Sequence, residues 1–366
     1  MKVLHIFPEF RRGGAPVNTL RFIKASCDSL VHIAAGSAVD VDFVNDFRPY
    51  AETWDVNLTK PSPGSFLKLL RRTKEEVPDI VHANGKSGMF YGLLLFLFLP
   101  RDTRFFLTLR GFHDKYSGMK SRFYRFLERI MARRVEAVIC VSPSERQHYL
   151  TLIKADKDKV LIIPNGIDVH EVELPSQIDK VCRNFQVNIV SLSRTSPQKD
   201  LETMIRSFEI AASGRKDTAL HIMGGLSHGE EEYQKRIYDL WKSSSVSEKI
   251  FFWGDVKEAG NLISNFSIYL STARFEGLPT AVVESFLSRI PVVGTDCIGN
   301  IDLIRDNETG WLTDIGDFKD TGKALSKAID SIGSKMESEI IDNAYNEALQ
   351  YSIENQAIRL LALYGL

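Results

Sequence analysis

The sequence predicts an α/β protein with two Rossmann-like domains, each built on a parallel sheet. Short β-branched apolar runs alternate with longer amphipathic stretches, as strands and helices do around a parallel sheet. The alternation restarts after a segment of turn residues and mixed charges near 171–186. With 366 residues, the chain is long enough for two domains of ordinary size.

In the first half, six short apolar runs are expected to be strands and five amphipathic stretches between them helices. The strands are KVLHIF, LVHIAA, DIVHA, RFFLTL, AVICVS and VLIIP, which begin at residues 2, 30, 79, 104, 137 and 160. The helices are 15–25, 65–76, 87–99, 120–134 and 144–153.

In the second half, five further apolar runs are expected to be strands, again separated by helical stretches. They are NIVSLS, ALHIMG, KIFFWG, SIYLS and IPVVGT. The expected organisation is an N-terminal Rossmann-like domain, an interdomain linker, a C-terminal Rossmann-like domain and a final helix, at 1–170, 171–186, 187–348 and 349–366.

Composition excludes several classes of protein. Hydrophobic residues make up 44% and charged residues 25%, which is typical of a globular chain. The formal net charge of −1 provides no general attraction to nucleic acid or membrane, so such binding would need a local patch. Four cysteines without a Cys-x-x-Cys pair indicate reduced thiols in the cytoplasm. The longest apolar run, 89–100, is shorter than the ~20 residues that span a bilayer.

Several familiar ligand motifs are absent. Gly-Lys-Ser at 85–87 would need a glycine at position 80 to form a phosphate-binding P-loop, and that residue is Ile80. No strand is followed by Gly-x-Gly-x-x-Gly, which counts against a dinucleotide enzyme. The Asp-x-Asp triplets at 40–42 and 156–158 are interpreted as solvated surface charge. The histidines show no metal-ligand spacing, so no metal site is expected.

The segment ARFEGLPTAVVES carries two glutamates eight positions apart (284 − 276 = 8). Pro279 suits the first turn of a helix, which leaves Glu276 in a loop and Glu284 about one turn inside the helix. Eight helical residues span about 12 Å, more than the ~5–5.5 Å between the carboxyl groups of a retaining hydrolase. The two carboxylates therefore fit separate contacts on one extended ligand.

Positive charge and backbone donors accompany this glutamate pair. The N–H groups of Gly277, Leu278 and Thr280, beside a helix N-terminus, suit phosphate oxygens. Arg194 and Lys199 follow the first strand of the second domain, at the end of the sheet where ligands usually bind. Hydroxyl contacts at both ends with an anion site between them fit a nucleotide-diphosphate sugar.

Glu-Gly-Leu-Pro with a second Glu eight positions after the first resembles the signature of the retaining glycosyltransferases of family 4, which have the GT-B fold. Segments along nearly the whole chain resemble the same family. They are RRGGAPVNTL, DIVHANG, VICVSPSERQ, VLIIPNGIDV, SRTSPQKDLETMI and GWLTD. The resemblance implies two Rossmann-like domains facing a central cleft, of which the first binds the acceptor and the second the nucleotide-sugar. The final helix is then expected to cross back to the first domain.

The resemblance also implies roles for individual residues. Glu276 would contact hydroxyls of the transferred sugar, and Glu284 would accept hydrogen bonds from the ribose. Arg194 and Lys199 would clamp the diphosphate and stabilise charge on the departing nucleotide, so neither a metal nor another cofactor is required. Glu276, Arg194 and Lys199 are therefore the candidate catalytic residues.

The first domain contributes two further groups of candidates. Gly13 and Gly14 would let the backbone approach the phosphates and the acceptor. Many family members carry a Thr-x-His-Gly pattern, whereas this chain has Thr-Leu-Arg-Gly at 108–111 and a histidine slightly later. Either Arg110 or His113 would take the acceptor-side place of the family histidine, and the sequence leaves both open.

The resulting hypothesis is transfer of a sugar, with retention, from a nucleotide-diphosphate sugar to a hydroxyl of a glycan or lipid-linked acceptor. A UDP-sugar is the preferred donor, and cell-surface lipopolysaccharide or capsule biosynthesis is the expected setting. Base choice is expected to depend on residues around 223–226 and 253–256. Alternatives are a nucleotide-sugar epimerase or phosphorylase of related fold, and a non-catalytic sugar-nucleotide-binding protein. Nucleic-acid binding has no supporting motif.

Two basic, aromatic segments bear on localisation. Residues 115–134 and 65–74 combine cations with aromatic and aliphatic side chains at helical spacing. One interpretation is a pair of helices that each pack one face on the first domain. The other is docking on anionic lipid at the inner face of the plasma membrane, where a lipid-linked acceptor would lie. The expected localisation is cytoplasmic, with peripheral membrane contact under the second interpretation.

Overall fold

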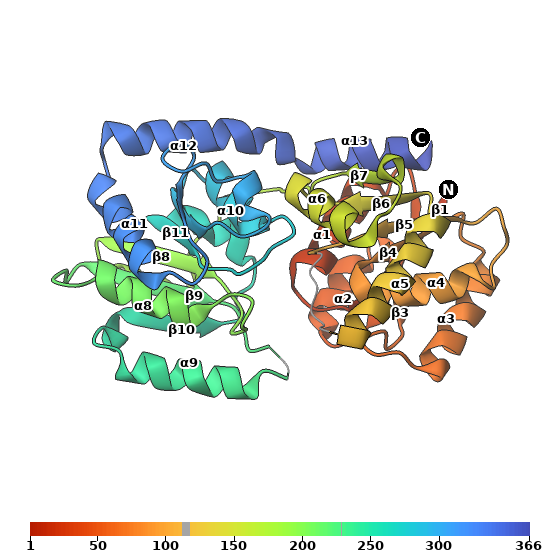
Figure 1. Ribbon diagram of the computed structural model, residues 1–366, viewed down its shortest axis with the longest axis horizontal. Helices are drawn as coiled ribbons and strands as arrows, with labels where there is room; N and C mark the ends of the chain where they lie inside the picture. The colour runs from red at the N-terminus through yellow and green to blue at the C-terminus, as the bar shows by residue number, and fades with distance from the viewer. Residues whose placement is uncertain (112–117, 228) are drawn as a thin grey trace. The chain divides into compact units, whose positions relative to one another are not determined.

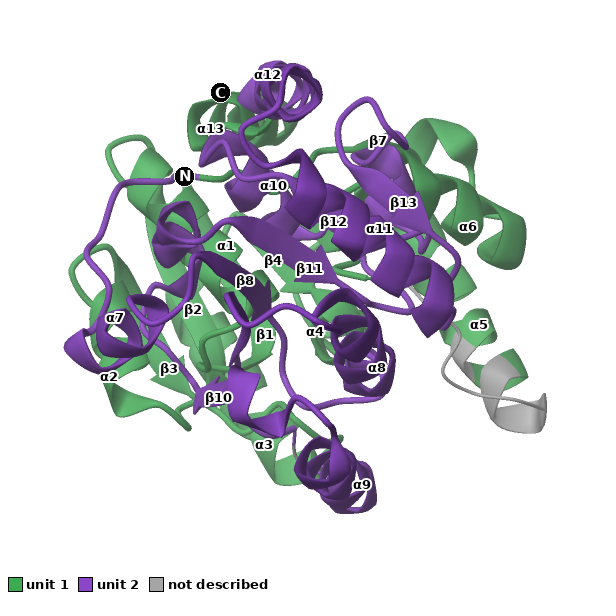
Figure 2. Ribbon diagram, turned by 90° about the vertical axis from the view of Figure 1, so that its left-hand side faces the viewer, with its two compact units in different colours: residues 1–167, 351–366 green, residues 168–350 purple. Residues whose placement is uncertain are grey.

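The computed structural model describes residues 1–111, 118–227 and 229–366, which form two compact units. Unit 1 comprises residues 1–167 and 351–366, and unit 2 comprises residues 168–350 (Figure 2). Each unit contains one sheet in which every described strand pair is parallel. The prediction of two Rossmann-like parallel-sheet domains is confirmed.

Unit 1 has a seven-stranded sheet in the order β3-β2-β1-β4-β5-β6-β7. Its strands are β1 (Lys2–Glu9), β2 (Val31–Ser37), β3 (Ala51–Asp55), β4 (Ile80–Asn84), β5 (Arg104–Thr108), β6 (Ala137–Cys140) and β7 (Val160–Ile162). Its α-helices, which Figure 1 labels, are α1 (Gly14–Ser26), α2 (Val41–Phe47), α3 (Pro63–Glu76), α4 (Gly85–Phe96), α5 (Gly118–Arg134), α6 (Pro143–Ile153) and α13 (Ile353–Tyr364). The three-residue helix η1 (Lys157–Lys159) precedes β7.

Local sequence explains where several of these helices begin. Ser62 caps α3 by accepting a hydrogen bond from the Ser65 N–H, and Ser142 caps α6 through the Glu145 N–H. In both helices a proline follows the cap, where its missing N–H would have no helical partner. The predicted starts of these helices therefore agree with the structure to within two residues.

Strand β3 was not predicted, because its sequence AETWD mixes charged and apolar residues. It lies at one edge of the sheet and pairs with β2 alone, so only Ala51 and Trp54 need to be buried. A short edge strand of this kind has little apolar signal.

Unit 2 has a six-stranded sheet in the order β10-β9-β8-β11-β12-β13. Its strands are β8 (Val187–Leu192), β9 (Thr218–Met223), β10 (Ile250–Gly254), β11 (Ile268–Ser271), β12 (Val292–Thr295) and β13 (Trp311–Thr313). Its helices are α7 (Ser176–Cys182), α8 (Leu201–Ala211), α9 (Glu231–Ser243), η2 (Ser247–Lys249), η3 (Ala259–Asn265), α10 (Thr280–Leu287), η4 (Asn300–Asp302), α11 (Phe318–Ser331) and α12 (Lys335–Ala348). The three-residue helix η5 (Leu349–Tyr351) follows α12.

Two features of unit 2 differ from the sequence prediction. The segment 171–186, expected to be a linker, contains helix α7, whose Ile178 and Cys182 are four residues apart and buried. The short run GWLTD, which was not among the predicted strands, contains strand β13, in which Trp311 is 2% exposed. Both elements are too short to show a clear period in the sequence.

The last helix, α13, packs within unit 1. Its Ile353, Ala357, Leu360 and Tyr364 are buried. Gly166 makes room for it, because a Cβ at that glycine would lie 2.6 Å from the Ile353 Cα. Arg104 of β5 donates a hydrogen bond from Nη1 to the Tyr364 carbonyl oxygen at 2.6 Å. Residues near the chain end therefore complete the core of the first unit.

Three buried histidines lie on neighbouring strands of the unit 1 sheet: His5 on β1, His32 on β2 and His82 on β4. His5 Nε2 and His32 Nδ1 share a hydrogen bond at 3.1 Å, and His82 is hydrogen-bonded to the hydroxyls of Tyr364 and Thr108. Burial lowers the pKa of His32 to about 4 and of His82 to about 3, and holds the pKa of His5 well below its usual value. All three rings are therefore neutral at pH 7.

We expect this cluster to make unit 1 sensitive to acid. An unfolded chain protonates histidine near pH 6.5, whereas the folded His32 and His82 accept protons only near pH 4 and pH 3. Between these values the unfolded state binds more protons, so the free energy of unfolding falls as the pH drops. Urea unfolding of His32→Asn at pH 7.5, 6 and 5 should show a smaller pH dependence than wild type. An unchanged slope, matching that of a variant at the exposed His170, would contradict the expectation.

Among the described residues, every helix is too short or too polar to cross a membrane.

Candidate functional site

Three of the predicted donor-site residues lie at one end of the unit 2 sheet. Strands β8 and β11 are neighbours there although β9 and β10 lie between them in the sequence, so the strand order reverses at this point. Arg194 and Lys199 lie in the loop that leaves β8, and Glu276 lies in the loop that leaves β11. Ligands of open parallel sheets bind at such reversals, outside the carboxyl ends of the strands.

Lys199 and Glu276 form a direct ion pair. Lys199 Nζ donates a hydrogen bond to Glu276 Oε1 at 2.6 Å, and the two side chains are only 21% and 13% exposed. Cys297 lies close to this pair. Burial, and then the Glu276 carboxylate, raise the pKa of the Cys297 thiol to about 12. The thiol therefore stays protonated and adds no charge beside Lys199 and Glu276.

Several hydrogen bonds join the two loops that carry this pair. Thr272 Oγ1 donates to the Lys199 carbonyl oxygen at 2.9 Å. The Arg274 N–H donates to the Gln198 carbonyl oxygen at 2.8 Å, and Gln198 Nε2 donates to the Phe275 carbonyl oxygen at 3.1 Å. These bonds fix the backbone on both sides of Lys199 and immediately before Glu276.

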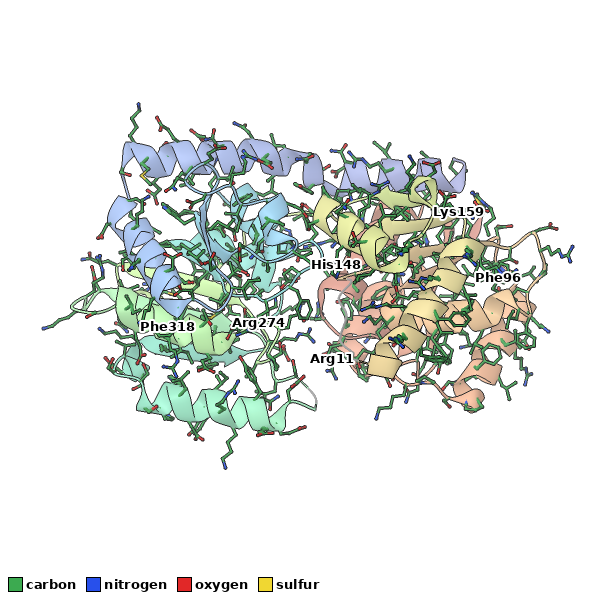
Figure 3. The ribbon with its side chains drawn as sticks, viewed as in Figure 1. Arg11, Phe96, His148, Lys159, Arg274 and Phe318 are labelled. Atoms are coloured by element: carbon green, nitrogen blue, oxygen red, sulfur yellow. The ribbon has the colours of Figure 1, made fainter. Side chains whose placement is uncertain are left out.

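Asp200 adds a further connection between the two loops, which the sequence analysis did not predict. It has φ 48°, a left-handed conformation that costs a non-glycine residue energy. Its side chain caps α8 by accepting from the Thr203 N–H, and its Oδ2 lies 2.8 Å from Arg274 Nη2 (Figure 3 labels Arg274). The spacing of an aspartate three residues before Thr203, at a helix start, was the available sequence signal.

Glu284 lies in α10, one turn from the helix start, and is 6% exposed. Thr280 is the first residue of that helix, and Leu278 is buried beside it. Gly277 lies against Gly299, whose φ of 91° requires glycine and where a Cβ would lie 2.8 Å from the Gly277 carbonyl oxygen. The close approach holds the loop between the two glutamates against the loop after β12.

Tyr269 of β11 is a second residue that sequence reasoning missed. It is 2% exposed, and burial, followed by the Glu276 and Glu284 carboxylates, raises its pKa. Its phenol thus lies within electrostatic reach of both glutamates and stays neutral. Arg194 differs from the other candidates, because its side chain is exposed and makes no ion pair within the described part of the chain.

Unit 1 holds the remaining candidates at its own reversal of strand order, between β1 and β4. Gly13 precedes α1 as its N-cap, and Gly14 is the first residue of that helix. A Cβ would meet nothing within 4 Å at Gly14 and only the Arg11 carbonyl oxygen, at 3.9 Å, at Gly13. His113 lies outside the described residues.

Arg110 is engaged by three asparagines. Its Nη1 donates to Asn18 Oδ1 at 2.7 Å and to Asn165 Oδ1, while Nε and Nη2 donate to Asn84 Oδ1 at 3.2 and 3.0 Å. Burial lowers the pKa of Arg110 to about 10, with Glu145 acting in the opposite direction. The guanidinium therefore joins α1, the end of β4 and the loop after β7. The asparagines are scattered in the sequence, so no motif indicated this arrangement.

Within the described residues, no group of three or more His, Cys, Asp or Glu side chains is placed to hold a metal ion. The candidate donor site of unit 2 thus consists of one cation paired with Glu276, a second, exposed cation, and the buried Glu284. Such a set can bind phosphate through Lys199 and Arg194 and hydroxyl groups through the two carboxylates.

Two family models match this chain and together cover most of it. The model described as Glycosyl transferases group 1 matches residues 184–347, and the model described as Glycosyltransferase Family 4 matches residues 31–171. The chain belongs to the family 4 glycosyltransferases. The recognition made from the sequence is therefore confirmed at the level of the family.

Curated relatives of this family 4 chain are distant. The poly(ribitol-phosphate) alpha-N-acetylglucosaminyltransferase of Staphylococcus aureus (strain COL) is 22% identical over 298 residues, which are 77% of this chain and 55% of that protein. The capsular polysaccharide biosynthesis glycosyltransferase CapM of Staphylococcus aureus is 23% identical over 276 residues, 72% of this chain and 71% of that protein. The chain thus spans little more than half of the first relative's length.

Among solved structures, Anabaena Alr3699/HepE in complex with UDP-glucose matches with a TM-score of 0.85 and 18% identity, over 100% of both chains. At this identity the likeness concerns the fold. Together with the two Rossmann-like units, it confirms the GT-B fold class expected for this family 4 glycosyltransferase.

Proposed function

We propose that this protein transfers a sugar from a nucleotide-diphosphate sugar to a hydroxyl of a glycan or lipid-linked acceptor, with retention and without a metal ion. UDP is the proposed nucleotide, because the Anabaena protein of the same fold was crystallised with UDP-glucose. Cell-surface polysaccharide biosynthesis is the proposed setting, since the name of the relative CapM places that protein in capsular polysaccharide biosynthesis.

The departing nucleotide is the group that needs most stabilisation during sugar transfer. The acceptor oxygen forms a bond to the anomeric carbon while the bond from that carbon to the β-phosphate oxygen breaks, and the acceptor proton passes to the departing phosphate. Negative charge grows on the diphosphate during this step. Lys199 and Arg194 supply cations at the carboxyl end of β8, where they oppose that charge. Glu276 then binds sugar hydroxyls and Glu284 binds the ribose.

The observation that carries the proposal is the Lys199–Glu276 pair at the reversal of strand order in unit 2, with Glu284 buried in the next helix. A cation for the phosphate and a carboxylate for the sugar are adjacent there. A nucleotide-sugar epimerase of related fold remains the alternative enzyme, and a protein that only binds sugar nucleotides is the non-catalytic alternative.

The test compares nucleotide binding by wild type and Glu284→Ala. Melting temperatures are measured by thermal shift with UDP, GDP, ADP and their common sugar conjugates, without metal. The UDP compounds should raise the melting temperature of wild type. Glu284→Ala should lose most of that shift, because each lost hydrogen bond to a charged group costs about 1.5–3 kcal/mol, or roughly 10-fold or more in affinity.

The outcomes separate the candidate functions. No shift with any nucleotide would contradict the proposal, and a shift with GDP or ADP compounds would change the donor. Conversion of the donor in the absence of an acceptor would favour the epimerase. If the protein binds the nucleotide-sugar tightly but neither hydrolyses it slowly nor transfers its sugar to any of a panel of polysaccharide acceptors, the non-catalytic binding protein is favoured.

Peripheral contact with anionic membrane belongs to the same proposal. Helices α3, α4 and α5 lie together in unit 1 (Figure 1). Five apolar side chains on or next to them are 50–66% exposed: Leu67 on α3, Leu97 and Phe98 just after α4, and Phe123 and Phe126 on α5. Cations on α3 and α5 flank them. These side chains suit the boundary between headgroups and acyl chains.

Sedimentation with vesicles tests this contact. Wild type should pellet with vesicles that contain anionic lipid more than with zwitterionic vesicles, and Phe123→Ser/Phe126→Ser should pellet several-fold less. Ile358→Ser is the matched control, because Ile358 is 64% exposed on α13. Equal pelleting of all three proteins would remove the membrane from the proposal.

A further inference from the structure

We propose that Gly260 is a positioning residue for nucleotide binding, which acts by leaving space for the Glu284 carboxylate. The inference rests on the proposed function, in which Glu284 binds the nucleoside. Gly260 itself carries no side chain that could bind a ligand. Its contribution lies in the absence of a Cβ at a point where a functional carboxylate needs that volume.

A side chain at position 260 would overlap the Glu284 carboxylate. Gly260 is the second residue of η3, the short helix that follows β10, and Glu284 lies in α10, which packs against η3. A Cβ built on Gly260 would lie 2.6 Å from Cδ and Oε2 of Glu284 and 2.7 Å from Oε1. All three carboxylate atoms therefore occupy the place that a side chain at position 260 would take.

Backbone conformation does not explain the glycine. Gly254, at the end of β10, has φ 67° and lies in the left-handed region, whereas Gly260 does not. An alanine at position 260 is therefore compatible with the backbone, and it favours helical conformations more than glycine does. The expected effect of Gly260→Ala comes from the new Cβ and its contact with Glu284.

The atoms that meet this Cβ are at the end of a flexible side chain, which decides the kind of effect. The three atoms nearest to the new methyl group all belong to the Glu284 carboxylate, so turning that side chain about its own torsions relieves the closest contacts. The carboxylate then no longer lies where the nucleotide would meet it. The inference thus predicts loss of binding without comparable loss of stability.

A double-mutant cycle with UDP as the probe tests this. Kd for UDP is measured by calorimetry for wild type, Gly260→Ala, Glu284→Ala and the double variant, and melting temperatures are recorded alongside. Gly260→Ala should weaken UDP binding about 10-fold or more. In the Glu284→Ala background the same change should have no further effect, because the side chain through which Gly260 acts is gone. Gly64→Ala is the matched control, since its Cβ would meet only Ser62 Oγ at 3.9 Å.

The results distinguish failure of the Gly260 inference from failure of the proposed function. If Glu284→Ala binds UDP as wild type does, the proposed function fails. If Glu284→Ala loses binding but Gly260→Ala keeps it, only the inference is overturned. An equal loss from Gly260→Ala in both backgrounds also overturns it, since Gly260 would then act independently of Glu284. If Gly260→Ala has a lower melting temperature than wild type, the double variant should melt at the same temperature as Glu284→Ala. A double variant that melts below Glu284→Ala would contradict the proposed contact.

Discussion

Replacing Lys199 by methionine is expected to lower the rate of sugar transfer by about 10²–10³-fold, the usual cost of losing one preorganised group that stabilises transition-state charge. Lys199 follows β8, and its Nζ lies 2.6 Å from Glu276 Oε1 at a site where it is 21% exposed. Limited contact with water makes its charge more effective than that of a fully exposed lysine. The loss should appear mainly in kcat, because the charge on the diphosphate grows as the glycosidic bond breaks.

Release of UDP from a UDP-sugar, with and without acceptor, measures this effect. Lys199→Arg keeps the positive charge in a different shape and should retain part of the activity. Lys180→Met is the control, because Lys180 is exposed on α7. A Lys199→Met variant that keeps its kcat and raises only KM would assign Lys199 to ground-state binding instead of leaving-group stabilisation.

Replacing Glu276 by glutamine is expected to have opposite effects on turnover and on product binding. Transfer should fall by two orders of magnitude or more, because the sugar loses its carboxylate contact. UDP itself should bind about 5-fold more tightly. In the free protein Glu276 holds Lys199 in an ion pair, and a phosphate that recruits Lys199 must compete with that carboxylate. An ion pair of this kind contributes on the order of 1 kcal/mol, which corresponds to roughly 5-fold in affinity.

Calorimetric titration of UDP into wild type, Glu276→Gln, Lys199→Met and the double variant checks both the sign and the cause. The gain in affinity should disappear in the Lys199→Met background, because no cation is then released. Weaker UDP binding by Glu276→Gln would show that the carboxylate supports the nucleotide directly. In that case the pair in the free protein does not compete with phosphate.

The sequence predicted the elements that have strong local signals. The strands with continuous apolar runs agree with the structure. Helices α3 and α6, which a serine cap and a proline begin, also start within two residues of the predicted positions. Strand β3 at a sheet edge, the short strand β13 and helix α7 within the expected linker were missed, since each buries only one or two side chains. Their signal lies in the sheet or core that they join, which a local window does not contain.

The candidate site divides in the same way. The sequence by itself predicted the candidate residues and their local setting: a cation pair after one strand, a glutamate in a loop and a second glutamate in the helix that follows. It also identified the family whose models the chain matches. It also predicted the helix at 15–25, which the structure begins one residue earlier, at Gly14.

Only the tertiary structure decided which of these groups meet. Lys199 and Glu276 are 77 positions apart and touch because β8 and β11 are adjacent in the sheet. Three other contacts depend on strand order in the same way. They are the Asp200–Arg274 ion pair, the packing of the Glu284 carboxylate against Gly260, and the hydrogen bonds from Arg110 to asparagine side chains. Strand order is set by the burial of whole faces and by crossover connections, not by any short pattern along the chain. For that reason residue identities are readable from the sequence, whereas their partners come from the fold.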